Sequence, residues 1–185
     1  MLSLVTSNKH KYEEIFSYLN SKHIEIKWVQ MSYEEIQADD NETISIDSCK
    51  KLTNKIRQPF FLEDTGLYIA NLNGFPGPYS SYVQNTIGNE NILKMASDSK
   101  AYFKTVITLY WRKNFYQFSG MLNGKISSKI SGNLGFGYDP IFIPDNSNKT
   151  LGEMTTDEKN KISHRFLALK KLYGFIVEND VKNNL

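Results

Sequence analysis

The chain has 185 residues, of which 40% are hydrophobic and 23% are charged, the ordinary composition of a globular protein. Its 11 Phe, 11 Tyr and 2 Trp residues exclude an intrinsically disordered chain. No apolar run approaches the roughly 18 residues that a membrane-spanning helix needs, and the N-terminus lacks the pattern of a secretory signal peptide. We therefore expect a soluble, cytoplasmic protein with no membrane partner, folded as one domain over residues 1–185 with two lobes around one cleft.

The cysteine, histidine and charge content excludes further classes. Cys49 is the only cysteine, so the chain has neither an intramolecular disulfide nor a multi-thiolate zinc site, and the three histidines lack metal-ligand spacing. Residues 1–100 carry 10 basic and 13 acidic groups, a net −3, and residues 101–185 carry 12 and 7, a net +5. A nucleic-acid-binding module that uses the basic half is an alternative, which the total charge of +2 disfavours.

Periodicity and breaker residues predict a mixed α/β fold with an elongated sheet flanked by helices. Strands are expected at residues 2–6, 24–29 and 60–62, followed by a long hairpin of residues 102–111 and 115–122. Helices are expected after the capping pair Ser7-Asn8, over residues 46–56 and 87–95, and in a final helix capped by Thr156-Asp157. The polar tail, residues 178–185, is expected to fray.

The first candidate motif is the turn from the first strand into the first helix, Thr6-Ser7-Asn8-Lys9-His10-Lys11. Free backbone N–H groups and the helix dipole favour an anion at such a turn. Lys11 stands in the first helical turn, where its ammonium group could reach a phosphate oxygen. The alternative is an ordinary capped helix.

The second motif is acidic. Glu63-Asp64-Thr65-Gly66 follows an apolar strand, and carboxylates at the end of a strand face the crevice where α/β sheets bind ligands. Residues 28–49 contain no Lys or Arg but six carboxylates, among them Glu35. The pair at 63–64, aided by Glu35, is a candidate Mg²⁺ site. The alternatives are a turn at Asp64-Thr65-Gly66 and a solvated acidic loop.

The third and fourth motifs lie in the basic half. Gly135-Phe136-Gly137-Tyr138-Asp139-Pro140 is a shaped loop with two aromatic rings, which either stack on a nucleobase or anchor the loop in the core. Lys159 and Ser163 are four residues apart on the predicted final helix, beside His164 and Arg165. The alternative for this segment is a solvated basic face.

Together these motifs resemble the inosine triphosphate pyrophosphatase family over nearly the whole chain. The matching segments occur in the family's order: Thr6-x-Asn8-x-x-Lys11, Glu63-Asp64-Thr65-Gly66-Leu67, Gly74-x-Pro76-Gly77-x-Tyr79-Ser80, Gly135-Phe136-Gly137-Tyr138-Asp139-Pro140-x-Phe142 and Lys159-Asn160-x-x-Ser163-His164-Arg165. The resemblance implies a two-lobed α/β fold with a long, mixed, twisted sheet and a central nucleotide cleft, a homodimer, and no nucleic-acid partner.

The resemblance also implies an activity and its residues. The activity is hydrolysis of ITP, dITP or XTP between the α- and β-phosphates, with Mg²⁺, which cleanses the nucleotide pool. Asp64 would be the general base and a metal ligand, with Glu35 as the other metal carboxylate. Thr6, Ser7, Asn8, Lys11 and Thr65 would hold the triphosphate. Phe136 and Tyr138 would sandwich the base, and Gly137, Asp139, Lys159, Ser163, His164 and Arg165 would complete the nucleoside pocket. A pyrophosphatase for pyrimidine or modified nucleotides is the enzymatic alternative.

Overall fold

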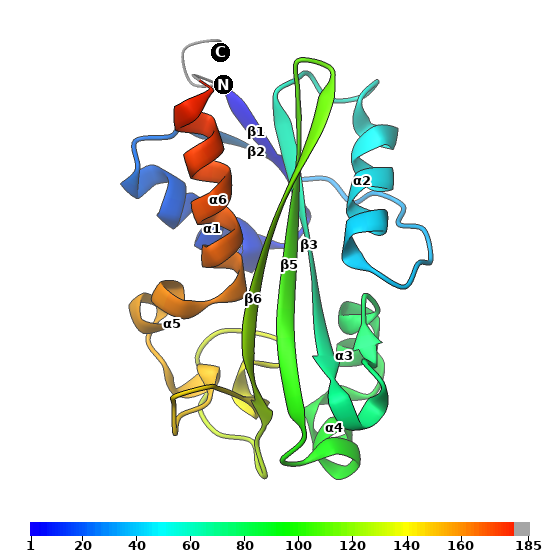
Figure 1. Cartoon of the computed structure of the whole chain (residues 1–185), viewed down its shortest axis with the longest axis vertical. Helices are drawn as coiled ribbons and strands as arrows, with labels where there is room; N and C mark the ends of the chain where they lie inside the picture. Colours follow the sequence, from blue (N-terminus) through cyan, green and yellow to red (C-terminus); the bar gives the residue numbers. More distant parts are fainter. Residues whose placement is uncertain (180–185) are drawn as a thin grey trace. The chain divides into compact units, whose positions relative to one another are not determined.

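The computed structural model describes residues 1–179, which form a mixed sheet with helices packed against it (Figure 1). The strands are β1 (Leu2–Val5), β2 (Ile26–Val29), β3 (Phe60–Ile69), β4 (Pro76–Gly77), β5 (Lys100–Trp111), β6 (Asn114–Ile126) and β7 (Phe142–Pro144). The α-helices are α1 (Lys9–Ser21), α2 (Asn41–Leu52), α3 (Ser80–Thr86), α4 (Gly88–Ala96), α5 (Thr156–Ile162) and α6 (His164–Glu178). The predicted α/β class with a mixed sheet is confirmed. Most of the predicted fraying tail, from residue 180 on, lies outside the described residues.

The chain divides into two compact units. Unit 1 comprises Met1–Asp64, Thr105–Gly120 and Arg165–Leu185, and unit 2 comprises Thr65–Lys104 and Met121–His164. Strands β3, β5 and β6 each pass from one unit into the other. Within residues 1–179, no helix is long and apolar enough to cross a membrane.

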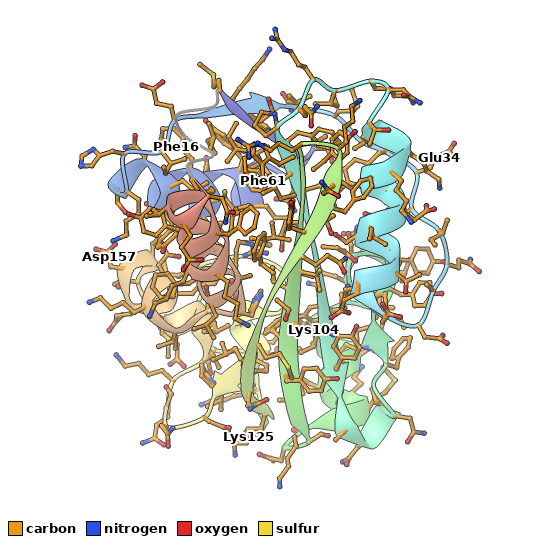
Figure 2. All side chains as sticks on the ribbon, turned by 45° about the horizontal axis from the view of Figure 1, so that its top comes forward. Phe16, Glu34, Phe61, Lys104, Lys125 and Asp157 are labelled. Atoms are coloured by element: carbon orange, nitrogen blue, oxygen red, sulfur yellow. The ribbon has the colours of Figure 1, made fainter. Side chains whose placement is uncertain are left out.

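In unit 1 the strand order is β2-β1-β3-β5-β6, with β1 parallel to both β2 and β3. Helices α1 and α6 cover one face of these strands and α2 covers the other (Figure 1). Because side chains alternate along a strand, neighbouring residues of β3 enter different cores. Phe61 packs with residues of α1 and α6 and is enclosed by other side chains (Figure 2), whereas Phe60 and Leu62 pack with Cys49 and Leu52 of α2.

In unit 2, β4 pairs antiparallel with β3, and β7 pairs antiparallel with β6. The core of this unit joins Leu67 of β3, Phe103 of β5 and Phe142 of β7 with residues of α3 and α4. The loop before β7 belongs to the same core through the buried Tyr138.

Several predicted boundaries shift. The hairpin is confirmed, with a two-residue turn at Arg112 and Lys113, both at positive φ as a tight hairpin requires. Strand β3 runs on to Ile69, so the acidic motif lies inside a strand instead of at its end, and the alternative of a turn at Asp64-Thr65-Gly66 is wrong. Helix α2 begins at Asn41, five residues before the predicted start, because the Asp40 carboxylate caps it by accepting from the Thr43 N–H. Helix α3 and strand β7 were not predicted.

The single final helix is also wrong. Two helices, α5 and α6, meet at Ser163, whose extended backbone (φ −64°, ψ 150°) interrupts the helical path. The cap of α5 is Thr155, one residue before the predicted pair, and it forms a reciprocal capping box with Glu158. Apolar residues of the segment that was predicted as one helix therefore enter two different cores: Ile162 packs in unit 2, and Leu169 packs in unit 1.

The loop that carries Phe136 to Asp139 depends on a close backbone approach at Gly132, which we expect to be intolerant of a side chain. Gly132 has φ +77°, and an added Cβ would overlap the Gly152 carbonyl group, so Gly132→Ala combines backbone strain with a clash and costs about 3 kcal/mol or more. Gly137→Ala is the matched control, since its φ of +63° is equally strained but no atom lies within 4 Å of the added Cβ. Urea unfolding of both variants measures the difference, and equal stability would contradict the close approach.

Candidate active site

In unit 1, the turn after β1 is held by hydrogen bonds from several directions. The Thr6 N–H donates to the Val29 carbonyl at 3.2 Å, and the Trp28 indole N–H donates to the Thr6 carbonyl at 2.9 Å. The Thr6 hydroxyl accepts from the Asn8 N–H at 3.1 Å, and the Asn8 side chain caps α1 by accepting from the Lys11 N–H at 3.1 Å. Ser7 is exposed at the tip of this turn. The predicted phosphate-binding turn is therefore a rigid entry into a helix N-terminus, the arrangement that favours an anion.

The acidic motif on β3 separates its two carboxylates. Glu63 and Asp64 are consecutive strand residues, so their side chains leave opposite faces of the sheet. Glu63 lies on the side of α1 and α6, and Asp64 lies on the side of α2. Both are buried, at 3% and 8% exposure. As a result, the two carboxylates have different partners.

Glu63 lies within a buried ion network. Its Oε2 is 3.1 Å from the Lys11 Nζ, and its Oε1 accepts from the Arg165 Nη2 at 3.2 Å and from the Thr105 hydroxyl at 3.3 Å. Arg165 also pairs with Glu14 of α1. Burial alone would lower the pKa of Arg165, but Glu63 and Glu14 reverse this effect and raise its pKa, so the guanidinium stays charged.

Asp64 has a neutral partner. Its Oδ2 accepts a hydrogen bond of 2.7 Å from the Asn41 amide at the start of α2. Glu35 lies at the surface in the acidic stretch, and its pKa is raised by loss of solvation and by the negative charge of Asp64, while Lys11 lowers it. Burial and the charges of Glu35 and Asp64 likewise raise the pKa of the Tyr33 hydroxyl. Glu35 is therefore influenced by the charges of both Asp64 and Lys11.

The carboxylates of this region suit a metal ion that takes most of its ligands from water and substrate instead of from the protein. Within residues 1–179, no group of three or more His, Cys, Asp or Glu side chains is arranged to hold a metal by itself. Mg²⁺ characteristically binds proteins through one or two carboxylates and completes its shell with water and substrate phosphates. Asp64 and Glu35 are the carboxylates that the sequence predicts for such a site, whereas Glu63 pairs with Lys11 and Arg165. Glu34 lies at the surface (Figure 2).

In unit 2, the loop at residues 135–139 is organised by Asp139. Its Oδ2 accepts from the Phe136 N–H at 2.8 Å and pairs with the Lys159 Nζ at 2.6 Å, and the side chains of both ionic partners are only 5% exposed. The same ammonium group lies 4.8 Å from the centroid of the half-buried Phe136 ring. The structure thus brings Phe136, Asp139 and Lys159, from two of the predicted motifs, into contact with one another.

The other predicted residues of unit 2 are more deeply placed. Tyr138 is buried in the core, its hydroxyl donates to the Ser80 carbonyl at 2.9 Å, and burial raises its pKa. For Tyr138 the core-anchor alternative fits better than base stacking.

Ser163 is buried at the junction of α5 and α6, and the buried His164 ring stacks on Phe103 with centroids 4.7 Å apart. The Gly137 carbonyl accepts from Gln84 and Asn89. Thr65 is half-buried on β3.

Sequence reasoning missed the residues that hold these groups in place. Asn41, Thr105 and Glu14 support the carboxylates and Arg165 in unit 1, and Gln84 and Asn89 fix the loop in unit 2. They belong to no motif of consecutive residues. The one sign of such residues in the sequence is a polar residue at a position that the helical or strand period places in the interior. Asn41 and Thr105 are examples.

The buried Asp139–Lys159 pair makes unit 2 sensitive to the loss of one partner. Lys159→Met should lower the free energy of unfolding by about 3–5 kcal/mol, because Asp139 would be left charged and uncompensated in the interior. The double variant Asp139→Asn/Lys159→Met should recover much of that loss, since the amide oxygen can still accept from the Phe136 N–H. Urea unfolding of the three proteins measures both effects, and wild-type stability of Lys159→Met would contradict the buried pairing.

Comparisons with known proteins identify the family of the chain. The sequence profile of the Ham1 family matches residues 2–175. The chain is 45% identical to the dITP/XTP pyrophosphatase of Thermococcus kodakarensis, covering 96% of this chain and 98% of the relative, and 47% identical to that of Pyrococcus horikoshii, covering 95% and 96%. The solved HAM1 protein of Coxiella burnetii superposes with a TM-score of 0.81 at 29% identity, covering 96% of this chain and 100% of that one. The family resemblance of the motifs is confirmed, and the chain belongs to the Ham1 family.

Proposed function

We propose that this protein hydrolyses the non-standard purine nucleoside triphosphates ITP, dITP and XTP to the monophosphate and pyrophosphate. The observation that carries the proposal is that the adjacent carboxylates of Glu63 and Asp64 have different partners. Glu63 pairs with Lys11 and Arg165 on one face of β3, whereas Asp64 lies on the other face, where it accepts a hydrogen bond from the Asn41 amide and is an electrostatic neighbour of Glu35. The names of relatives at 45% and 47% identity, dITP/XTP pyrophosphatase, support the substrate class.

The residues assigned to the triphosphate lie in the turn into α1 and on β3. Thr6, Ser7 and Asn8 form the turn into α1, and Lys11 projects from the first helical turn with 20% of its side chain exposed. Thr65 follows Asp64 on β3. A phosphate chain carries several negative charges, which the helix N-terminus and the Lys11 ammonium group would compensate as charge develops on the leaving pyrophosphate.

The proposed cofactor is Mg²⁺, held by Asp64 and Glu35. When bound, it would neutralise phosphate charge and make water more acidic. Glu35 has a raised pKa because of partial burial and the nearby Asp64, so a cation between neighbouring carboxylates would relieve a repulsion that the protein already contains. Asp64 would accept the proton of the attacking water as general base.

Residues of unit 2 are assigned to the nucleoside. Phe136 offers a half-buried ring for base stacking, in a loop fixed by Asp139, Lys159 and the Gly137 carbonyl contacts. Ser163 and Tyr138 support this region from the interior. A stacked base contributes about 1–3 kcal/mol.

Recognition of a 6-oxo purine is proposed for His164 and Arg165. Donors aimed at a 6-oxygen would be left unpaired against the 6-amino group of adenine, at a cost of about 1–3 kcal/mol. The Glu14 and Glu63 carboxylates pair with Arg165 and hold its guanidinium group in one orientation.

The proposed setting is a cytoplasmic homodimer that acts on free nucleotides. Exposed aromatic residues occur close together in unit 2, where Phe75, Tyr79 and Tyr82 are 39%, 42% and 70% exposed within eight residues of chain. Exposed apolar groups of this kind are typical of surfaces that pair with a second protein surface.

The substrate assignment predicts a distinct ranking in a panel of nucleotides. With Mg²⁺ present, pyrophosphate release from ITP, dITP and XTP should exceed release from ATP by about tenfold or more, because the lost donor contacts cost about 1–3 kcal/mol. Coupled detection of pyrophosphate measures the rates, and chelation of the metal should abolish them. Preferential turnover of UTP or TTP would replace the proposal with a pyrimidine enzyme. Salt-dependent nucleic-acid binding without turnover would replace it with a binding module.

Asp64→Asn should reduce kcat for ITP by about 10²- to 10⁴-fold, because the amide cannot accept the proton of water. The fold should persist, since the amide oxygen still accepts from Asn41, and circular dichroism with thermal unfolding checks this. Glu34→Gln is the matched control, because it removes an exposed carboxylate from the same acidic stretch. A fully active Asp64→Asn protein would contradict the assignment of the base.

A further inference from the structure

Helix α2 presents polar side chains to the interior. Asn41 and Ser45 are four residues apart on one helical face, and both are 0% exposed. A buried polar side chain is retained at little cost only where it is hydrogen-bonded. Their partners lie on the strands: Asn41 bonds to Asp64 of β3, and the Ser45 hydroxyl bonds to the Thr108 hydroxyl of β5 at 2.5 Å.

The start of α2 is fixed by contacts independent of Asp64. The Asp40 carboxylate accepts from the Thr43 N–H at 2.6 Å and caps the helix. The Gln117 amide of β6 donates to the Glu42 carbonyl at 2.9 Å. These two contacts flank Asn41 and hold its backbone, so its side-chain amide meets Asp64 from a fixed position.

The Asn41–Asp64 bond is suited to orienting a carboxylate. At 2.7 Å it is short, as expected for an N–H donor on an ionised acceptor. It is made to Oδ2, which fixes the rotation of the carboxylate plane while adding no charge to the site. Lys or Arg in the same place would also neutralise Asp64, as Lys11 and Arg165 do for Glu63.

We propose that Asn41 is a positioning residue that holds the Asp64 carboxylate in the orientation required to bind the metal and accept a proton. This inference rests on the proposed function. Asn41 does not touch substrate; it acts by restricting Asp64. Partners that orient a metal-binding carboxylate typically contribute 10- to 100-fold to metal affinity or activity.

The test compares Asn41→Ala with Ser45→Ala. Both remove a fully buried polar group from the same face of α2, but only the first removes a bond to Asp64. Asn41→Ala should lower kcat for ITP by about 10- to 100-fold with KM changed less than about threefold, and it should weaken Mg²⁺ binding, measured by calorimetry without nucleotide, by about tenfold. Ser45→Ala should leave kcat and Mg²⁺ affinity within about twofold of wild type, even if its thermal stability falls as much as that of Asn41→Ala.

Asn41→Leu serves if Asn41→Ala is too unstable to fold, because leucine has the same number of side-chain heavy atoms and a similar branched shape but no N–H donor. It should show the same losses. Wild-type kcat and Mg²⁺ affinity in Asn41→Leu, or equal losses in Ser45→Ala, would overturn the inference while leaving ITP hydrolysis by the wild type intact. If the wild type binds Mg²⁺ but hydrolyses no nucleotide, the proposed function fails. In that case Mg²⁺ affinity still tests the inference, and an unchanged affinity in Asn41→Leu would overturn it. A wild type with neither property overturns both.

Discussion

Two carboxylates next to each other in a buried strand are a source of repulsion that the fold must resolve. Strand β3 does so by alternation, which sends Glu63 toward α1 and α6 and Asp64 toward α2. The first carboxylate is compensated by two cations, Lys11 and Arg165. The second lies on the opposite face, where the Asn41 amide donates to it. The chemistry that we assign to this protein depends on that asymmetry, because it gives the two adjacent carboxylates different partners and allows them different roles.

Unit 2 also contains a buried carboxylate that is compensated by a cation. Asp139 and Lys159 are almost inaccessible to water and are paired at 2.6 Å, and the carboxylate also fixes the Phe136 backbone. Buried ion pairs contribute little net stability compared with apolar packing. In this protein the ions of such pairs instead orient their surroundings, because each ion holds a neighbouring loop or side chain in one arrangement. Unit 1 uses Arg165 similarly, since its guanidinium joins α1 to β3 through Glu14 and Glu63.

Local chemistry made much of the fold predictable from the sequence, and long-range chemistry did not. The hairpin at Arg112 and Lys113 and the cap at Asn8 follow from short patterns. The length of β3 did not, because Asp64-Thr65-Gly66 has turn propensity that strand pairing overrides. The break at Ser163 was hidden by a helical period that continues across it. Family motifs identified Asp64 and Asp139, whereas Asn41 and Glu14 act across large sequence separations that no local pattern records.

The position of a bound divalent cation tests the asymmetry between Glu63 and Asp64 most directly. Mn²⁺ is a spectroscopic and crystallographic substitute for Mg²⁺ with a similar preference for oxygen ligands. Anomalous diffraction from crystals soaked in Mn²⁺ should show a peak within coordination distance of the Asp64 carboxylate, with Glu35 as the second protein ligand and the Glu63 pairings to Lys11 and Arg165 unbroken. A peak coordinated by Glu63, or an Asp64 carboxylate that contacts no ion at saturating Mn²⁺, would contradict it.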